Sequence, residues 1–343
     1  MGNRPVLWMS DEIFGKHDPG YRHPESAQRF YAIEQMSKEI EDVELIRIPA
    51  RRATEEELLW VHRRSYIDIV NETDGRSVAL DPDTHTSPDS VKAAYLAAGG
   101  SVEITKAVLD GKAKSGFANV RPPGHHAESN RAAGFCIFNN VAIAGEYAIK
   151  KAGLSRVAII DPDGHHGNGT MHHFYERKDA LYISIHRYPF YPGTGTVNEV
   201  GRGGGEGFTV NIPFDGGMGD AEYLAAFDRI IIPVLEQYEP QLVLVSAGFD
   251  AHESDPLVGM NVTTEGFGAM MSRLANIADK FADGRIIGFL EGGYNTNALA
   301  ESVHTTLRIF SGARVEFSAP PPSVYGDENI RRAETWVKRY WNI

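Results

Sequence analysis

The sequence has 343 residues, of which 42% are hydrophobic and 23% are charged, with a formal net charge of -12. This charge argues against nucleic acid or an anionic membrane surface as the main partner, and it suits a cationic substrate. Cys136 is the only cysteine, which excludes an intramolecular disulfide and predicts a reducing, cytoplasmic environment.

The number of domains and the cellular location are predicted from the segments that the sequence lacks. No linker, repeat or charge block divides the chain, so we expect a single domain over residues 1–343. The N-terminal residues, beginning Met1-Gly2-Asn3, lack the apolar stretch of a signal peptide, and no window is as long as a membrane span. The sequence leaves open whether the protein forms a homo-oligomer.

The predicted elements alternate between short apolar strands and longer helices. A strand at 6–9 precedes a helix from about residue 26, and Thr54 opens another helix with a capping-box pattern. In the long helix at 91–109, Gly99-Gly100 indicates close packing against a neighbour. Further helices are expected at about 140–151 and 220–238, and further strands at 116–120, 157–160, 181–186 and 208–212 and from about 241 and 285. This alternation predicts an α/β fold whose mainly parallel, multi-stranded sheet is flanked by helices on both faces.

The candidate metal-binding residues are concentrated in the segment 157–170, where an apolar strand is followed by Asp161, Asp163 and His165. Open α/β sheets bind ligands just beyond the carboxyl ends of their strands. Asp163 and His165 are two residues apart, so in an extended backbone their side chains would point to the same side and could share a metal ion. The alternative is an aspartate-rich turn that holds no ligand.

Polar residues also follow three other predicted strands, namely His125-His126, Asp250 and Tyr294. A positioned imidazole suits proton transfer because it titrates near neutral pH, although one buried and one exposed histidine is the structural alternative. Asp163, His165 and Asp250 would hold a metal with one position open for water and substrate. Zinc is preferred, and the oxygen-rich set also admits iron(II). A tyrosine nearby would donate a hydrogen bond to an oxyanion.

Four motifs carry a family resemblance. RPPGHHAE, DxDxHHGNGT, GFD before DPL, and EGGYN occur in this order within about residues 20–310. They resemble the zinc-dependent histone deacetylase family, which includes bacterial deacetylase-like amidohydrolases and acetylpolyamine amidohydrolases, and RPPGHHAE, GFCIFNN and HHGNGT look like its class II branch. The resemblance implies an arginase/deacetylase-like fold.

The resemblance also implies a role for each matching residue. Asp163, His165 and Asp250 would be the zinc ligands. His125 and His126 would be the tandem catalytic histidines, with Asp161 behind the first and Asn168 behind the second, and Tyr294 would polarise the carbonyl. Because an amide raises imidazole basicity less than a carboxylate does, the pKa values of the two histidines should differ, with His126 as the base.

Channel and potassium residues are implied in the same way. Asp83 matches the rim residue that holds the substrate backbone, and the channel for the acyl-lysine stem would be lined by Gly134, Phe135, Tyr191, Leu257 and Gly292. One structural potassium ion would be held by Asp161, Asp163, His165, Ser184 and Ile185, and a second by backbone oxygens of Phe174, Arg177 and Ala180.

Four positions bear on the choice of function. Pro162 and Gly164 stand where the family usually has bulky apolar residues and could loosen the metal-bearing strand, and Met171 replaces a polar residue. Leu257 stands where polyamine-selective relatives have a glutamate, which favours acyl-lysine substrates.

We therefore predict a metal-dependent amidohydrolase that removes an acetyl or other acyl group from a lysine-like amine. The alternatives are acetylpolyamine hydrolysis and an acyl-lysine-binding or scaffold protein whose metal binding is spoiled. A two-metal guanidine hydrolase needs more carboxylates than this sequence offers.

Overall fold

The centre of the fold is an eight-stranded sheet in the order β2-β1-β5-β10-β9-β6-β7-β8, in which all neighbouring strands are parallel. The computed structural model describes residues 4–315 and 317–343, so Met1 to Asn3, which entered the argument about a signal peptide, lie outside it. The strands are β1 (Val6–Met9), β2 (Leu45–Ile48), β5 (Ser115–Ala118), β6 (Val157–Asp161), β7 (Ala180–Arg187), β8 (Thr209–Phe214), β9 (Leu242–Ala247) and β10 (Ile286–Leu290). A small hairpin of β3 (Ala79–Asp81) and β4 (Thr84–His85) stands apart from this sheet.

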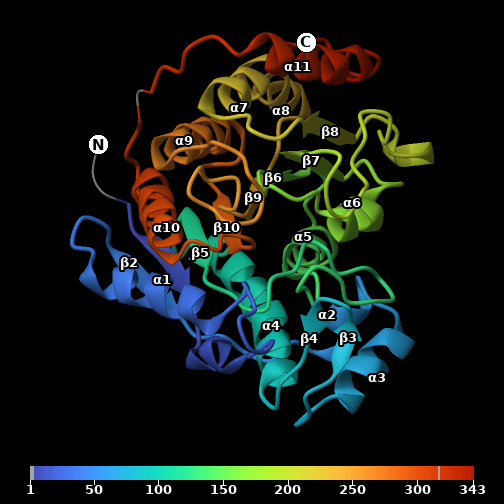
Figure 1. Ribbon diagram of the computed structural model, residues 1–343, viewed down its shortest axis with the longest axis vertical. Helices are drawn as coiled ribbons and strands as arrows, with labels where there is room; N and C mark the ends of the chain where they lie inside the picture. The colour runs from blue at the N-terminus through green and yellow to red at the C-terminus, as the bar shows by residue number, and fades with distance from the viewer. Residues whose placement is uncertain (1–3, 316) are drawn as a thin grey trace.

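Helices cover both faces of the sheet (Figure 1). One face is covered by α1 (Ala27–Glu39), α7 (Asp220–Ala226), α8 (Ile232–Tyr238), α9 (Thr264–Phe281) and α10 (Thr296–Phe310). The other is covered by α4 (Ser90–Leu109), α5 (Asn140–Lys150) and α6 (Asn168–Phe174), with the short α2 (Glu55–Leu59) and α3 (Arg64–Glu72) beside them. Because both faces are covered, β5, β6, β9 and β10 are buried along their whole length. The predicted fold class is confirmed.

Local predictions hold at several helices. Thr54 forms the expected capping box with Glu57 at the start of α2. In α4, a Cβ atom at Gly99 would lie 2.2 Å from the backbone oxygen of Arg51, so the glycine permits the close approach that the sequence indicated. The helix expected at 220–238 is interrupted by a π-helical turn, Phe227–Ile231, before α8. Pro233 lies at the start of α8 and has no N–H to donate into that turn.

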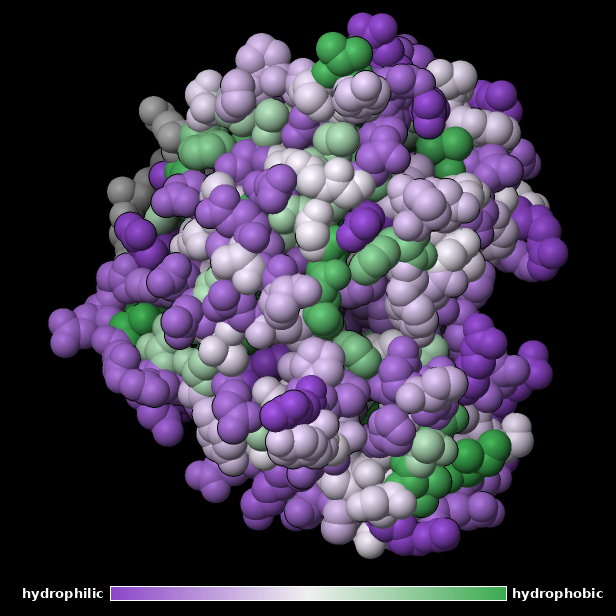
Figure 2. Space-filling model, in the orientation of Figure 1, coloured by the Kyte–Doolittle hydropathy of each residue, from purple (hydrophilic) through white to green (hydrophobic). Residues whose placement is uncertain are grey.

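The C-terminal part of the chain packs on the outside of the fold. Helix α11 (Val324–Val337) packs on β8 and α7. Beyond it, the indole N–H of Trp341 donates to the backbone oxygen of Gly207 at 2.8 Å. Hydrophilic residues predominate on the face drawn in Figure 2, with hydrophobic residues scattered among them. In the described residues, every helix is too short or too polar to cross a bilayer.

Candidate metal centre and pocket

The sheet order brings the predicted chemistry to one place. β5, β10, β9 and β6 are consecutive neighbours in the sheet, although β10 is the last strand in the chain. The segments that follow these four strands carry the predicted catalytic and metal residues. Because parallel strands end at a common edge, the side chains converge there.

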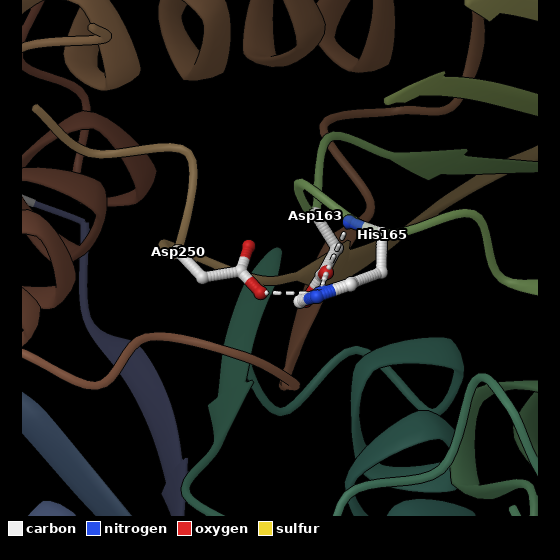
Figure 3. A group of neighbouring side chains, drawn as sticks. All are labelled: Asp163, His165 and Asp250. Carbon is white, nitrogen blue, oxygen red and sulfur yellow. Dashed lines mark hydrogen bonds and ion pairs between the residues drawn. The ribbon is translucent and has the colours of Figure 1, made fainter. Parts of the chain in front are cut away.

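Asp163, His165 and Asp250 face one another across a small space (Figure 3). Nδ1 of His165 lies 2.8 Å from Oδ2 of Asp250 and 3.2 Å from Oδ1 of Asp163. One ligand atom from each residue lies within 4.8 Å of the others. Among the described residues, this is the one group of three or more histidine, cysteine or acidic side chains placed to hold a metal ion.

The two buried carboxylates of this triad are stabilised by a positive charge between them. Burial, and then the neighbouring Asp163 carboxylate, raise the pKa of Asp250 to about 7. Burial would lower the pKa of His165, but the carboxylates of Asp250 and Asp163 outweigh it and raise that pKa to about 10. A divalent cation would neutralise the two buried carboxylates, and two oxygens with one imidazole leave a coordination position open. The residues therefore fit zinc or iron(II).

Gly164 lies in close contact with the segment that carries Asp250. Its N–H donates to Oδ1 of Asp250 at 2.6 Å, which ties the metal-bearing loop to the third predicted ligand. A Cβ atom at this position would lie 2.5 Å from Cγ1 of Val258, so the space of the usual bulky side chain is already filled. Pro162 comes directly after the last residue of β6, beyond the paired register. Both contacts argue against a loose loop at Gly164, and the effect of Pro162 and Gly164 on metal binding stays a prediction.

The two tandem histidines lie side by side, with ring centroids 4.0 Å apart. Nδ1 of His125 is 3.1 Å from Oδ2 of Asp161, and Nδ1 of His126 is 2.8 Å from Oδ1 of Asn168. Burial opposes the charged form of His125, but Asp161 and then Asp163 raise its pKa well above the ordinary value. Burial and the charge on His125 hold the pKa of His126 well below it. The pKa values differ in the direction that the sequence predicted, which leaves His126 neutral at neutral pH.

A pocket of about 260 Å³ leads to the triad. All six residues that the resemblance assigned to the channel line it, together with His125, His126, His165, Tyr294 and two residues without a prior assignment, Pro123 and Phe190. The ring of Phe190 stacks on His165, with centroids 5.4 Å apart. Phe135 adopts a φ of 69°, rare for a residue with a side chain, and its N–H donates to Oγ1 of Thr84 at 3.0 Å. Backbone strain of this kind is typical of functional sites.

Tyr294 reaches the pocket from the segment after β10. Its ring lies edge-on to Phe135 with centroids 6.0 Å apart, and its backbone N–H donates to Oδ2 of Asp255 at 2.7 Å. Burial, followed by the charge of Asp250, raises the pKa of the phenol well above the ordinary value. The hydroxyl therefore stays protonated and can serve as a hydrogen-bond donor.

Comparison with known proteins agrees with this arrangement. The sequence pattern described as "Histone deacetylase domain" matches residues 23–310. This chain belongs to the histone deacetylase family. It is 40% identical to a "Probable deacetylase" of Archaeoglobus fulgidus over 332 residues, which are 96% of this chain and 90% of that protein. It is 42% identical to "Histone deacetylase HDA1" of Candida albicans over 283 residues, 78% of this chain but 34% of the yeast protein.

A solved structure shows the same fold. The crystal structure of the HD domain of HDA15 superposes with a TM-score of 0.92 at 36% sequence identity and covers 98% of this chain and 95% of that domain. "Histone deacetylase 15" of Arabidopsis thaliana is 39% identical over 302 residues, which are 54% of that protein. This histone deacetylase family chain thus spans most of the archaeal relative but about half or less of these two eukaryotic ones.

Sequence reasoning missed a group of buried charges behind the pocket. Nε of Arg29 donates to the backbone oxygen of Gly293 at 2.6 Å, and its guanidinium lies 5.1 Å from the ring centroid of Tyr294. Oε2 of Glu291 accepts the N–H groups of Gly124 at 2.7 Å and His125 at 3.1 Å. These bonds hold the backbone segments that carry Tyr294 and His125. A faint sequence signal was the helical spacing of Glu25 and Arg29, but a charged pair at that spacing usually lies at the surface.

Replacing Glu25 by glutamine is expected to destabilise the protein strongly. The Glu25 carboxylate accepts from Arg121 Nε at 2.5 Å and from Arg29 Nη1 at 2.9 Å, and all three side chains are buried. Without it, two guanidinium charges stay buried with less compensation, which typically costs about 3–5 kcal/mol. Urea unfolding of both proteins measures this loss.

The pH dependence provides a further check. Burial would raise the pKa of Glu25, but Arg121 and His17 outweigh burial and hold that pKa well below the ordinary value. The Glu25 contribution is therefore full above the ordinary pKa of the unfolded chain and is lost as the pH falls through the folded value. The difference between the proteins should shrink in acid. Glu55→Gln, which removes an exposed partner of Arg64, should leave the unfolding midpoint nearly unchanged. Equal midpoints for the wild-type and Glu25→Gln proteins at neutral pH would contradict this account.

Proposed function

We propose that this chain is a zinc-dependent deacetylase that hydrolyses the amide bond of acetylated lysine-like amines. The observation that carries this proposal is the meeting of Asp163, His165 and Asp250 in a pocket that also presents His126 and Tyr294. Membership of the histone deacetylase family supports the same reaction.

The roles of the residues follow from their charge states. A zinc ion held by Asp163, His165 and Asp250 would supply Lewis acidity for the amide carbonyl and the attacking water. Neutral His126 takes the proton of the attacking water and returns it to the leaving amine. The Tyr294 hydroxyl donates to the carbonyl oxygen as negative charge develops there. His125 is held in place by Asp161, and the positive charge of His125 stabilises the negative charge that develops on the carbonyl oxygen.

The pocket walls support acyl-lysine over acetylpolyamine substrates. Phe135 and Tyr191 are aromatic walls suited to an aliphatic stem, and Asp83 at the rim can accept an N–H from a substrate backbone. Leu257, which is 37% exposed at the mouth, brings no charge to a second ammonium group. The preferred substrate is therefore an acyl-lysine in a peptide.

Iron(II) is the alternative metal, because the donor set is rich in oxygen. We also propose structural potassium at the two sites that the family resemblance implies. Asp161, the last residue of β6, is the register partner of Ser184 within β7, which supports the first site. The second site uses backbone oxygens near α6 and β7 at Phe174, Arg177 and Ala180. The single cysteine and the negative charge support a cytoplasmic protein that does not bind nucleic acid as its main partner.

Tyr294→Phe is the experiment that tests the proposed reaction. Loss of one hydrogen bond to the developing oxyanion is expected to lower kcat by about 10²–10³-fold, with the zinc content unchanged. Steady-state hydrolysis of an acetyl-lysine peptide, longer acyl-lysine peptides and N-acetylputrescine measures both rate and preference. Hydrolysis of N-acetylputrescine without hydrolysis of any acyl-lysine would favour the acetylpolyamine alternative. A purified chain that binds no metal would favour the scaffold alternative.

A further inference from the structure

A chain of side-chain contacts leads from His126 towards the surface. Oδ1 of Asn168 lies 2.8 Å from Nδ1 of His126, and Nδ2 of Asn168 donates to Oε1 of Glu128 at 2.6 Å. The side chain of Glu128 is 11% exposed, and on its outer side Oε1 lies 2.8 Å from Nδ1 of His172, a residue of α6 that is 44% exposed. Sequence reasoning assigned no role to Glu128 or His172.

This arrangement decides which way the Asn168 amide points. An ionised carboxylate can only accept hydrogen bonds, so Glu128 must face the NH₂ group of Asn168. The amide oxygen then faces His126 and can only accept, which places the proton on Nδ1 and leaves the lone pair on Nε2. Without Glu128, only the long bond from Nδ2 to the backbone oxygen of His126, at 3.5 Å, would oppose rotation of the amide. A rotated amide would present its NH₂ group to Nδ1 and favour the other tautomer. That tautomer has a protonated Nε2 and cannot act as a base.

We propose that Glu128 is a positioning residue that orients the Asn168 amide and thereby keeps His126 in the tautomer able to accept a proton. This inference rests on the proposed function, in which His126 is the base. His125 has the Asp161 carboxylate as its direct partner. For His126 the corresponding carboxylate is that of Glu128, which acts through the Asn168 amide. The coupling is one of orientation and charge, since an amide side chain does not readily relay a proton.

The backbone around Glu128 is held independently of its side chain. The backbone N–H of Glu128 donates to the backbone oxygen of Arg131 at 3.0 Å, and the backbone oxygen of Glu128 lies 2.9 Å from Nδ1 of His62. Arg131 lies at 4.0 Å from the carboxylate and is 68% exposed, so it adds little. Replacement of the side chain should therefore leave the loop in place while it releases the amide.

The kinetic test uses Glu128→Gln and a rescuing second change. Glu128→Gln is expected to lower kcat on an acetyl-lysine peptide about tenfold, with KM changed less than about twofold. Adding Asn168→Asp should restore kcat to within about threefold of wild type, because a carboxylate accepts from Nδ1 in either orientation and the amide introduced at position 128 can donate to it. Glu222→Gln is the matched control. Counted over the whole residue, Glu222 is 7% exposed and Glu128 is 8% exposed, and Glu222 lies away from the pocket on α7.

A readout that needs no activity is the imidazole ¹⁵N spectrum of the purified protein, with the His126 signals assigned by their loss in His126→Ala. The wild type should show His126 protonated at Nδ1, and Glu128→Gln should shift this signal towards the average of two tautomers. An unchanged tautomer in Glu128→Gln would overturn the inference, as would a fall in kcat that Asn168→Asp does not rescue. If the wild type hydrolyses no acyl-lysine, the proposed function fails, and the ¹⁵N spectra still decide the role of Glu128.

Discussion

Asp250→Asn is expected to abolish metal binding and, with it, nearly all deacetylase activity. The change keeps the shape of a fully buried side chain but replaces an anionic ligand with a neutral amide. Asp163 and His165 would be left as two ligands, fewer than the three protein ligands of a catalytic zinc site. Because the metal supplies the Lewis acidity for the reaction, kcat/KM should fall on the order of a thousandfold or more.

Two measurements check this result. Elemental analysis of the purified variant should find far less than one zinc or iron per chain, and added zinc should raise the Tm of the wild type but not that of the variant. Asp220→Asn is the control, because Asp220 bonds Thr263 at the start of α9, away from the pocket, and should keep a full complement of metal. An Asp250→Asn protein that retains one tightly bound metal ion would show that the predicted ligand set is wrong.

His126→Ala is expected to produce the second large loss, about 10²–10⁴-fold in kcat, because His126 is the neutral imidazole that lines the pocket beside the triad. His125 cannot replace it, since Asp161 and Asp163 hold its pKa well above the ordinary value and keep it charged. The metal content should stay at the wild-type level, because His126 is bound to Asn168 and is not a member of the triad. This combination of lost activity and retained metal separates a base from a ligand.

The measurement pairs single-turnover hydrolysis of an acetyl-lysine peptide with metal analysis of the same sample. His173→Gln is a suitable control, because His173 also lies on α6 near the site but bonds Glu146. A His126→Ala protein with nearly normal turnover would assign the proton transfer elsewhere, with His125 as the first residue to test. Loss of metal in this variant would instead point to a ligand role for His126.

The buried charges show where sequence reasoning stops. Glu25, Arg29, Arg121 and Glu291 are ordinary charged residues in the sequence, and charged side chains are usually exposed. Their burial depends on backbone oxygens and partner charges from distant segments. The surroundings of Gly164 were not readable for the same reason, because the space beside it is filled by Val258 from another loop.

The amino-acid sequence by itself determined the alternation of strands and helices and the polar residues that follow each strand, because apolar runs, caps and glycine turns act locally. It also carried the motifs that predicted Asp163, His165 and Asp250 as a group. Only the tertiary structure decided that β10 lies between β5 and β9, so that four strand ends form one site. Hydrophobic periodicity reports which face of an element is buried but not which element covers it, so strand order and long-range contacts such as Glu128 with Asn168 come from the packing of the whole chain.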